Sequence, residues 1–370
     1  MEGSAEHAPP VRRILAIVLA VLVIGGVAAA VVAGRGTQGG STATTTVRGV
    51  IGSEKAEFFE DPEVVEALAD RGLTVKVETA GSWSMRDLPL KDYDFAFPSS
   101  SAPAEELSHW TKVRGGPVRP FYSPLVVVAH KTAAEVLDAN GLATLSGSEH
   151  TTGTLHMAAY LRAARRDTTW QQLEGTRGHQ ELTGTLFVTS TDPLSSNSGA
   201  LYLAAASFVA NGGKVVADGP AVDRAQGLLR KLVQVQGAQQ PSSDGPFRDF
   251  VSGVGNPLVM VYEQQVAALL LAGDDPGDLT VLYPDTTVSS DHTVVPVTEA
   301  GRRLGEALRT DAKLRALAVR HGFRPQGAPG EFTEATARYT GYLNQDLTGI
   351  RQAPVPTAEV LHELADRARS

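Results

Sequence analysis

The segment Leu186–Ala205 has the residue types that bind a small polar or anionic ligand. A β-prone run, 186–188, leads into a loop of hydroxyl and amide side chains, and an apolar helical run follows from Ala200. The first N–H groups of a helix have no intrahelical partner, and the helix macrodipole places partial positive charge there. Ordinary helix capping needs one polar residue, whereas positions 190–198 supply seven. We therefore expect a ligand contact at this loop, and capping alone is the alternative.

Polar residues follow other expected strands as well. They are Gly81 and Ser82, then Ser99–Ser101, then Tyr262 and Glu263. In open α/β sheets, ligands bind beyond the carboxyl ends of the strands. Turns favour Ser and Gly in any case, so one cluster means little. Four clusters in one fold, the loop 190–198 included, predict a shared cleft.

The elements that must position these clusters alternate along the chain. Apolar and β-branched runs predict strands over 47–51, 73–78, 93–97, 122–129, 186–188, 257–262 and 279–283. Apolar residues at helical spacing predict helices over 57–70, 132–140, 152–166, 200–209, 222–236 and 358–369, and one helix or two over 298–321. Alternation of this kind predicts an α/β fold, with parallel sheets that carry helices on their faces.

The N-terminal segment 14–33 contains no charge and no strongly polar residue. Its length is just enough for a helix to cross the hydrocarbon core of a bilayer. Arg12 and Arg13 precede it, which favours a cytoplasmic 1–13 and an exported remainder. We expect a single-pass transmembrane anchor in the cell membrane, with a signal peptide cleaved after Ala33 as the alternative. The Gly-, Ser- and Thr-rich segment 34–46 would be a flexible tether.

Composition excludes several classes of protein. The chain has no cysteine, which excludes disulfides, thiolate metal sites, a cysteine nucleophile and a lipidated N-terminal cysteine. The whole chain carries −8 and residues 1–46 carry +1, so the exported part carries −9. Because no basic face is visible, we expect no nucleic-acid partner.

Sequence motifs for catalysis or cofactor binding are incomplete. A serine-hydrolase elbow around Ser198 would need glycine at position 196, where Ser196 stands. A dinucleotide fingerprint fails at Leu258, and a P-loop fails at Phe208. The nine histidines show no metal-ligand spacing, so surface or capping positions are expected for them. We therefore expect no enzyme activity, no catalytic residue, no metal and no cofactor.

Six segments, in their order along the chain, resemble bacterial extracellular solute-binding proteins with the type II periplasmic-binding-protein fold, the branch that includes molybdate-type proteins. The segments are Ala80–Ser82, Ser99–Ser101, Tyr122–Val128, Ser190–Gly199, Val261–Gln265 and His321–Pro325. The likeness spans about residues 47–325, and the order of the segments is more specific than any one of them.

The resemblance implies two α/β lobes joined by strand-like hinges, with the ligand between them. Lobe I would hold 47–123 and 280–370, and lobe II would hold 124–279. It also implies a monomer that binds a small molecule or ion and delivers it to an ABC-type membrane permease. The implied ligand contacts are Gly81, Ser82, Ser99, Ser100, Ser101, Ser123, Thr191, Ser195, Asn197, Ser198, Tyr262 and Glu263.

Some questions stay open at this point. Glu263 could hold a cationic group of the ligand or form an ion pair with Arg224 or Arg248. Gram-positive members usually carry a lipidated cysteine, which this chain lacks. An anchored extracytoplasmic sensor or scaffold of the same fold, not coupled to transport, is therefore the alternative function. The resemblance gives no account of the residues after 330, and an oxyanion, a sugar, an amino acid and a peptide all remain candidate ligands.

Overall fold

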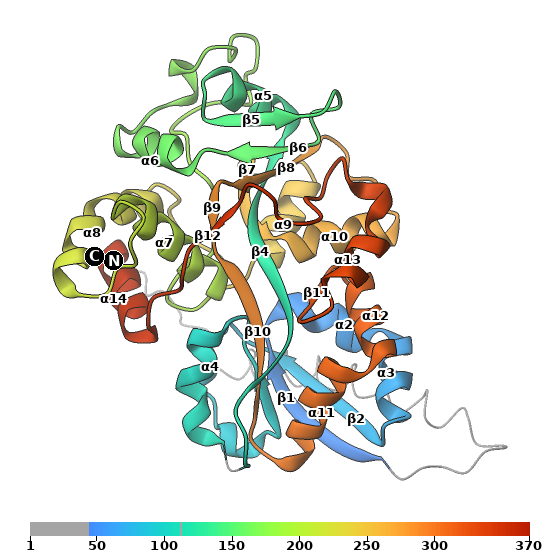
Figure 1. Ribbon diagram of the computed structural model, residues 1–370. Coiled ribbons are helices and arrows are strands. Elements are labelled where there is room, and N and C mark those ends of the chain that lie inside the picture. Colours follow the sequence, from blue (N-terminus) through green and yellow to red (C-terminus); the bar gives the residue numbers. More distant parts are fainter. Residues whose placement is uncertain (1–43, 112) are drawn as a thin grey trace, which may run out of the picture. The chain divides into compact units, whose positions relative to one another are not determined.

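The computed structural model describes residues 44–111 and 113–370 (Figure 1). Residues 44–370 belong to one compact unit. The predicted cytoplasmic segment 1–13, the anchor 14–33 and most of the tether lie outside the described residues, so these remain predictions. No helix in the described part of the chain is both long enough and apolar enough to cross a membrane.

Ten of the strands form one continuous sheet with two regions, which join where β10 pairs with β4. One region has the order β2-β1-β3-β10 and the other contains β7, β4, β8, β6 and β5. The bounds are β1 (Thr45–Ile51), β2 (Leu73–Thr79), β3 (Phe95–Phe97), β4 (Val118–His130), β5 (Ala143–Ser146), β6 (Thr152–Leu155), β7 (Leu258–Tyr262), β8 (Leu279–Pro284), β9 (Thr286–Thr287), β10 (Ser289–Pro296), β11 (Arg324–Pro325) and β12 (Arg351–Gln352). We call the part built on β1, β2, β3 and β10 the first lobe, and the part built on β5 to β8 the second lobe.

Strand directions are mixed rather than parallel throughout. β1 pairs parallel with β2 and β3, and β6 pairs parallel with β8. β10 runs antiparallel to β3, and β4 runs antiparallel to β7 and β8. β4 and β10 also pair antiparallel with each other, and Figure 1 shows them side by side. These two strands therefore connect the lobes, as hinges between two lobes would.

Helices cover both sheets. In the first lobe they are α2 (Ala56–Glu60), α3 (Pro62–Ala69), α4 (Ser101–Leu107), α11 (Glu299–Thr310) and α12 (Ala312–Arg320). The remaining helices are α5 (Lys131–Ala139), α6 (Met157–Arg165), α7 (Asn197–Ala210), α8 (Gly219–Gln234), α9 (Asp244–Val251), α10 (Glu263–Ala272), α13 (Pro329–Ala335) and α14 (Ala358–Arg369). Short 3-10 turns are η1 (Ser53–Lys55), η2 (Ser84–Asp87), η3 (Leu90–Asp92), η4 (Ser108–Trp110), η5 (Trp170–Gln172) and η6 (Ala337–Tyr339). The predicted mixture of helices and strands is confirmed.

An aspartate cap splits the predicted helix over 57–70, and another divides the segment 298–321, where one helix or two were expected. Asp61 accepts a hydrogen bond from the Glu63 amide and precedes Pro62, so the predicted helix over 57–70 becomes α2 and α3. Asp311 accepts from the Leu314 amide and separates α11 from α12. An N-cap side chain satisfies helix N–H groups that otherwise lack partners, which favours a new helix start at that point.

Other predicted elements differ in type. The predicted helix over 152–166 begins with a strand, because 152–155 pairs with β5 and β8 before α6 starts. The expected strand over 186–188 makes no ladder. The residues on either side of it form isolated bridges, Thr185 antiparallel with Thr169 and Thr189 parallel with Val259. β10 was not predicted. Its sequence lacks a long β-branched run, and the long strand β4 holds it in place.

The C-terminal helix α14 packs on α7 and α8 and shares their apolar core. Strand β8 likewise belongs to the sheet of the second lobe. Residues 280–370 were expected in lobe I. The contacts that α14 and β8 make with the second lobe differ from this expectation. The long sequence separation between α8 and α14 explains why the pairing could not be read from local patterns.

Candidate functional site

A polar pocket lies where residues of both lobes meet. Its free volume is about 10 Å³, roughly one water-sized sphere. The first lobe contributes Gly52, Ser53, Glu54, Ala80, Gly81, Ser82 and Ser99, and the second lobe contributes Ser196, Asn197, Pro241, Ser242, Ser243 and Tyr262. The lining is rich in hydroxyl groups, so the pocket offers hydrogen bonds from both lobes. Any ligand larger than water would need the lobes to separate for entry.

Asn197 links the two lobes at this pocket. It is the first residue of α7, and Ser196 before it makes no side-chain cap. The Asn197 Oδ1 accepts from Ser100 Oγ of the first lobe at 2.5 Å, and its Nδ2 donates to the Tyr262 hydroxyl at 3.0 Å. The start of α7 therefore takes part in contact between the lobes, beyond simple capping.

Gly81 allows a close backbone approach between the lobes. The Trp83 amide donates to the Ser195 carbonyl at 3.2 Å. A Cβ atom placed on Gly81 would lie 2.4 Å from that same carbonyl oxygen, a distance that no side chain tolerates. The glycine at position 81 is thus required by the contact itself.

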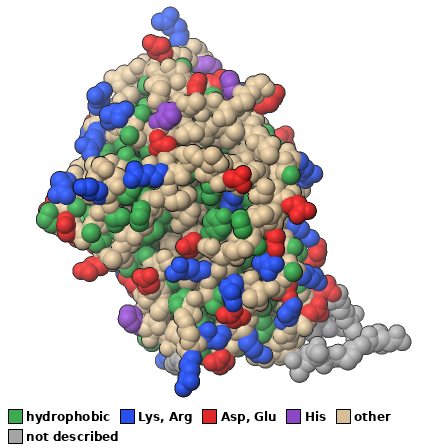
Figure 2. Space-filling model, in the orientation of Figure 1, with side chains coloured by type: hydrophobic (Ala, Val, Ile, Leu, Met, Phe, Trp, Pro, Cys, Tyr) green, Lys and Arg blue, Asp and Glu red, His purple; other side chains and the backbone are tan. Residues whose placement is uncertain are grey.

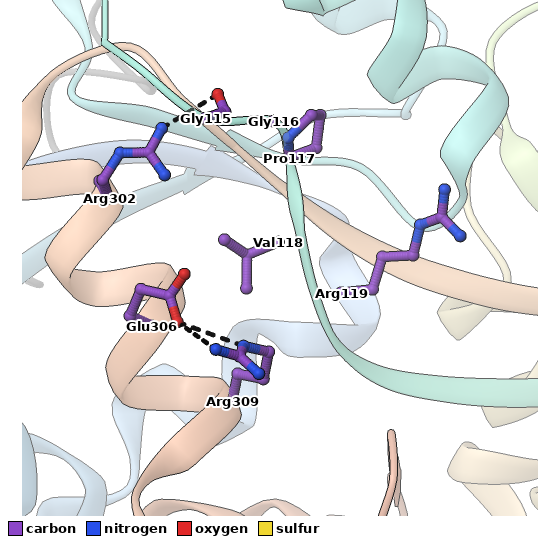
Figure 3. A pocket seen from close by; sticks show the side chains of 8 residues that line it. All are labelled: Gly115, Gly116, Pro117, Val118, Arg119, Arg302, Glu306 and Arg309. Carbon is purple, nitrogen blue, oxygen red and sulfur yellow. Dashed lines mark hydrogen bonds and ion pairs between the residues drawn. The ribbon is translucent and has the colours of Figure 1, made fainter.

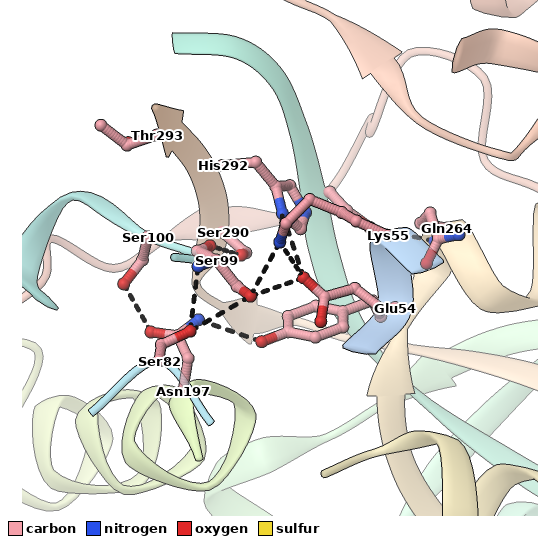
Figure 4. Close-up of polar contacts among 12 residues, drawn as sticks. Glu54, Lys55, Ser82, Ser99, Ser100, Asn197, Gln264, Ser290, His292 and Thr293 are labelled. Carbon is pink, nitrogen blue, oxygen red and sulfur yellow. Dashed lines mark hydrogen bonds and ion pairs between the residues drawn. The ribbon is translucent and has the colours of Figure 1, made fainter. Parts of the chain in front are cut away.

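A buried charged network stands beside the pocket (Figure 4). The Lys55 ammonium contacts Glu54 Oε1 and lies 3.2 Å from both Ser99 Oγ and His292 Nδ1. Ser99 Oγ donates to Glu54 Oε1 at 2.5 Å. The side chains of Glu54 and Lys55 are 5% and 1% exposed, and that of His292 is fully buried. Three acceptors around Nζ match the three N–H donors of a charged lysine.

Burial and neighbouring charges set the ionisation of this network. Burial alone would raise the pKa of Glu54, but the charge of Lys55 and its hydrogen bond to the carboxylate outweigh burial and hold that pKa well below its usual value. Burial and the charge of Lys55 lower the pKa of His292 from 6.5 to about 4. At neutral pH, Glu54 is therefore ionised and His292 is neutral. The His292 Nε2 atom has no hydrogen-bond partner among the described residues.

Glu54, Lys55 and His292 were not predicted from the sequence. Glu54 and Lys55 lie just after the end of β1, so they fit the same strand-end rule that selected the other polar clusters. His292 carried no local signal. The expectation that histidines occupy surface or capping positions is wrong for His292, which is wholly buried in β10.

The structure brings together five of the predicted contact residues. Gly81, Ser82, Ser99, Asn197 and Tyr262 all line the pocket. Ser82 Oγ accepts from the Ser99 amide at 3.0 Å and donates to Ser99 Oγ at 3.2 Å. Ser100 stands next to the lining through its bond to Asn197. That these residues contact a ligand remains a prediction.

Other predicted residues lie outside the lining. Thr191 and Ser198 bond each other through their hydroxyls at 2.8 Å. Ser123 is buried on β4, where its hydroxyl accepts from the Gln264 amide at 3.0 Å. Ser101 is half-buried at the start of α4, and Ser195 reaches the first lobe through its carbonyl.

Glu263 forms a buried ion pair, with Arg324 rather than with Arg224 or Arg248. Arg324 donates to its two carboxylate oxygens at 2.6 and 2.9 Å. The Tyr283 hydroxyl adds a third bond at 2.5 Å. Glu263 does not line the pocket. Of the two roles considered for it, the ion pair is the one that the structure contains.

A larger, open groove of about 490 Å³ lies elsewhere on the first lobe (Figure 3). Its charged residues are Arg119, Arg302, Glu306 and Arg309, and Glu306 already pairs with Arg309 at 2.6 Å. Acidic and basic side chains are mixed over the lower part of the face that Figure 2 shows. None of the predicted contact residues lines this groove, and we therefore place the candidate site at the smaller pocket.

Comparisons with known proteins bear on the fold. No family model and no curated protein matches the sequence. Among solved structures, the periplasmic binding protein AfuA of Actinobacillus pleuropneumoniae, with fructose-6-phosphate bound, has a TM-score of 0.55 at 13% identity, over 88% of this chain and 97% of that chain. Iron-bound HitA of Pseudomonas aeruginosa has a TM-score of 0.55 at 10% identity, over 88% and 99% of the two chains. A periplasmic thiamin-binding protein has 0.52 at 13%, over 90% and 99%.

The fold is that of the type II periplasmic binding proteins. These three structures are a periplasmic binding protein with fructose-6-phosphate bound, an iron-bound protein and a periplasmic thiamin-binding protein. At such low identity the likeness shows the fold and not the ligand. The molybdate-type branch of the resemblance remains a prediction.

Proposed function

We propose that this chain is an extracytoplasmic solute-binding protein that closes on a small polar ligand in the pocket between its lobes, without chemical change to the ligand. The observation that carries the proposal is the pocket itself, whose hydroxyl, amide and carboxylate groups come from both lobes. Two lobes connected by two strands can open and close around such a site. Burial between them would exclude water and strengthen the hydrogen bonds to the ligand.

The proposed contacts are the residues that already meet at the pocket. From the predicted set we retain Gly81, Ser82, Ser99, Ser100, Asn197 and Tyr262, and we add Ser53, Glu54, Ser242 and Ser243. Delivery to an ABC-type permease and tethering by the segment 14–33 are also part of the proposal. They are supported by the fold and by the apolar N-terminal sequence.

An anchored sensor or scaffold is the second candidate, and α14 favours it. His362 of α14 lies 2.8 Å from Glu106 of α4 and 2.8 Å from Arg86 of η2, both in the first lobe. Its ring also packs on Trp83, with the ring centroids 4.5 Å apart. Because α14 itself packs on the second lobe, opening of the lobes would move this helix, which suits a protein that reports binding to a partner.

The proposal is tested by thermal unfolding of the full chain in detergent against oxyanions, metals, amino acids, peptides and sugars. A ligand at about 100 times its Kd adds roughly 2.7 kcal/mol, which raises the Tm by a few degrees. Asn197→Ala should remove this shift. Asn211→Ala, at the other end of α7, should retain it. A folded protein whose Tm rises with none of these compounds would contradict the solute-binding function.

A further inference from the structure

The wall of the pocket carries one fixed charge, and that charge is negative. Among the thirteen lining residues, all of them in the described part of the chain, Glu54 is the only carboxylate and there is no lysine, arginine or histidine. The other ionisable group is the Tyr262 phenol, whose pKa is raised by burial and by the charge of Glu54. A ligand in the pocket therefore meets a carboxylate among neutral hydroxyls.

Lys55, the counter-ion of Glu54, offers nothing further to a ligand. Its three N–H donors are directed to Glu54, Ser99 and His292. Its Nζ also lies over the ring of Phe97, 4.9 Å from the centroid. Lys55 is not among the lining residues, so it holds Glu54 in place but leaves the pocket side of the pair negative.

A second carboxylate approaches from the other lobe. Asp244 directly follows the lining residues Ser242 and Ser243, and its Oδ1 accepts from Gln265 Nε2 at 3.1 Å. Asp244 itself is not among the lining residues. Burial raises the pKa of Asp244, and the charge of Glu54 adds to the rise. One carboxylate of the first lobe therefore lines the pocket, and one of the second lobe stands next to its lining residues.

Like charges in a poorly hydrated site repel strongly, and a cation between them relieves the repulsion. We propose that the ligand carries a protonated amine, together with hydroxyl or similar polar groups, and that Glu54 of the first lobe and Asp244 of the second lobe hold the amine. This inference rests on the proposed function, and it narrows the ligand from the polar or anionic class that the sequence predicted.

Two other ligand classes fit these surroundings less well. An anion would gain the partial charge at the start of α7, about half a unit, but it would face the full charge of Glu54. A bare metal ion needs several ligating side chains, and the described residues contain no group of three or more His, Asp or Glu that could hold one. An organic ammonium needs only the carboxylates, while its polar groups meet the serines.

The test uses three small probes that differ mainly in charge: ethanolammonium, ethylene glycol and glycolate. The full chain in detergent is unfolded thermally with each probe at about 50 mM and at equal ionic strength, since millimolar binding at that excess shifts the Tm by a few degrees. We expect ethanolammonium to raise the Tm, and we expect the other two probes to leave it within error of a sodium chloride control.

Glu54→Gln should abolish the shift. Glu60→Gln, an exposed glutamate of the neighbouring α2, should retain it. Glu54→Gln/Lys55→Met removes both charges of the pair and keeps the test valid if Glu54→Gln alone does not fold.

A larger shift with glycolate or ethylene glycol, or a full ethanolammonium shift in the folded Glu54 variant, overturns the inference. If a neutral or anionic compound of the wider panel binds equally well to the Glu54 variant, the proposed function stands and the inference fails. If nothing binds the wild type, both fail.

Discussion

Two buried carboxylates of this protein each have a cationic partner, and their surroundings differ. Glu263 is enclosed: Arg324 binds both of its oxygens and also donates to the carbonyls of Asn344 and Gln345 at 2.7 Å. Glu54 pairs with Lys55 on one side and lines a pocket on the other. A buried ion pair is therefore not by itself a ligand-binding site. A carboxylate is available to a ligand only where part of its surroundings is a cavity.

The two ion pairs should also differ in what they contribute to stability and to ligand binding. Removing one partner of a buried pair leaves a charge without compensation, whereas replacing both partners by apolar groups is often neutral. The Glu263 pair has further hydrogen bonds to the backbone that such a replacement would also remove. We therefore expect changes at Glu263 and Arg324 to destabilise the fold, and joint replacement of Glu54 and Lys55 to affect mainly ligand binding.

The largest expected effect is that of Arg324→Met. It leaves Glu263 buried without a counter-charge and takes the donors from two main-chain carbonyls, so unfolding in urea should require about 3–5 kcal/mol less free energy. Arg320→Met is the matched control on α12. Arg320 is half-exposed, and its pairs with Asp61 and Glu63 should contribute about 1 kcal/mol at most. Equal effects of the two substitutions would contradict the distinction.

A smaller effect is expected where the pair faces the pocket. Glu54→Gln/Lys55→Met should lie within about 2 kcal/mol of wild type in urea unfolding, because both charges leave together. Ligand binding should nevertheless be lost. If the double variant binds the ligand of the wild type with unchanged affinity, Glu54 is a structural residue like Glu263.

Acid should weaken the fold through His292. Its pKa is about 4 in the folded protein against 6.5 ordinarily, so between these values the unfolded chain binds the additional proton. Stability should therefore be complete above about pH 6.5 and fall by as much as about 3 kcal/mol as the pH approaches 4. Glu54, with a lowered pKa, acts in the same direction at lower pH. Urea unfolding at several pH values measures the slope.

His292→Asn is the matching variant, because its amide oxygen can replace Nδ1 as the acceptor for Lys55. Between pH 6.5 and 4 this variant should lose stability less steeply than wild type. An unchanged slope would mean that another group takes up the proton.

The smallest expected effect concerns Gly81. Gly81→Ala places a Cβ against the Ser195 carbonyl and hinders approach of the lobes, so ligand affinity should fall about tenfold, or about 1.4 kcal/mol. Each lobe retains its own core, so the Tm without ligand should change little. Gly116→Ala, where a Cβ meets nothing within 4 Å, is the control. Titration calorimetry on both variants decides whether closure at Gly81 matters for binding.

Local patterns in the sequence predicted much of this arrangement. Gly81, Ser99 and Tyr262 all line the pocket. They could be predicted because the strand-end rule needs only the positions where strands end, and local sequence indicates those positions. The same rule applied to the end of β1 would have selected Glu54. Partners far apart along the chain could not be predicted: His292 contacts Lys55 across 237 positions, and Arg324 contacts Glu263 across 61. Such pairings depend on tertiary packing, which a single sequence does not display.

We expect ligand binding to close the two lobes over the pocket. The chain has no cysteine, so Glu60→Cys on α2 and Val251→Cys on α9 provide the only two thiols, both at exposed positions of opposite lobes. Spin labels on these thiols in the full chain report the distance between the lobes by pulsed electron paramagnetic resonance. We predict a broad distribution without ligand and a shorter, narrower one with a compound that raises the Tm, ethanolammonium first. A distribution that such a compound leaves unchanged would contradict the account.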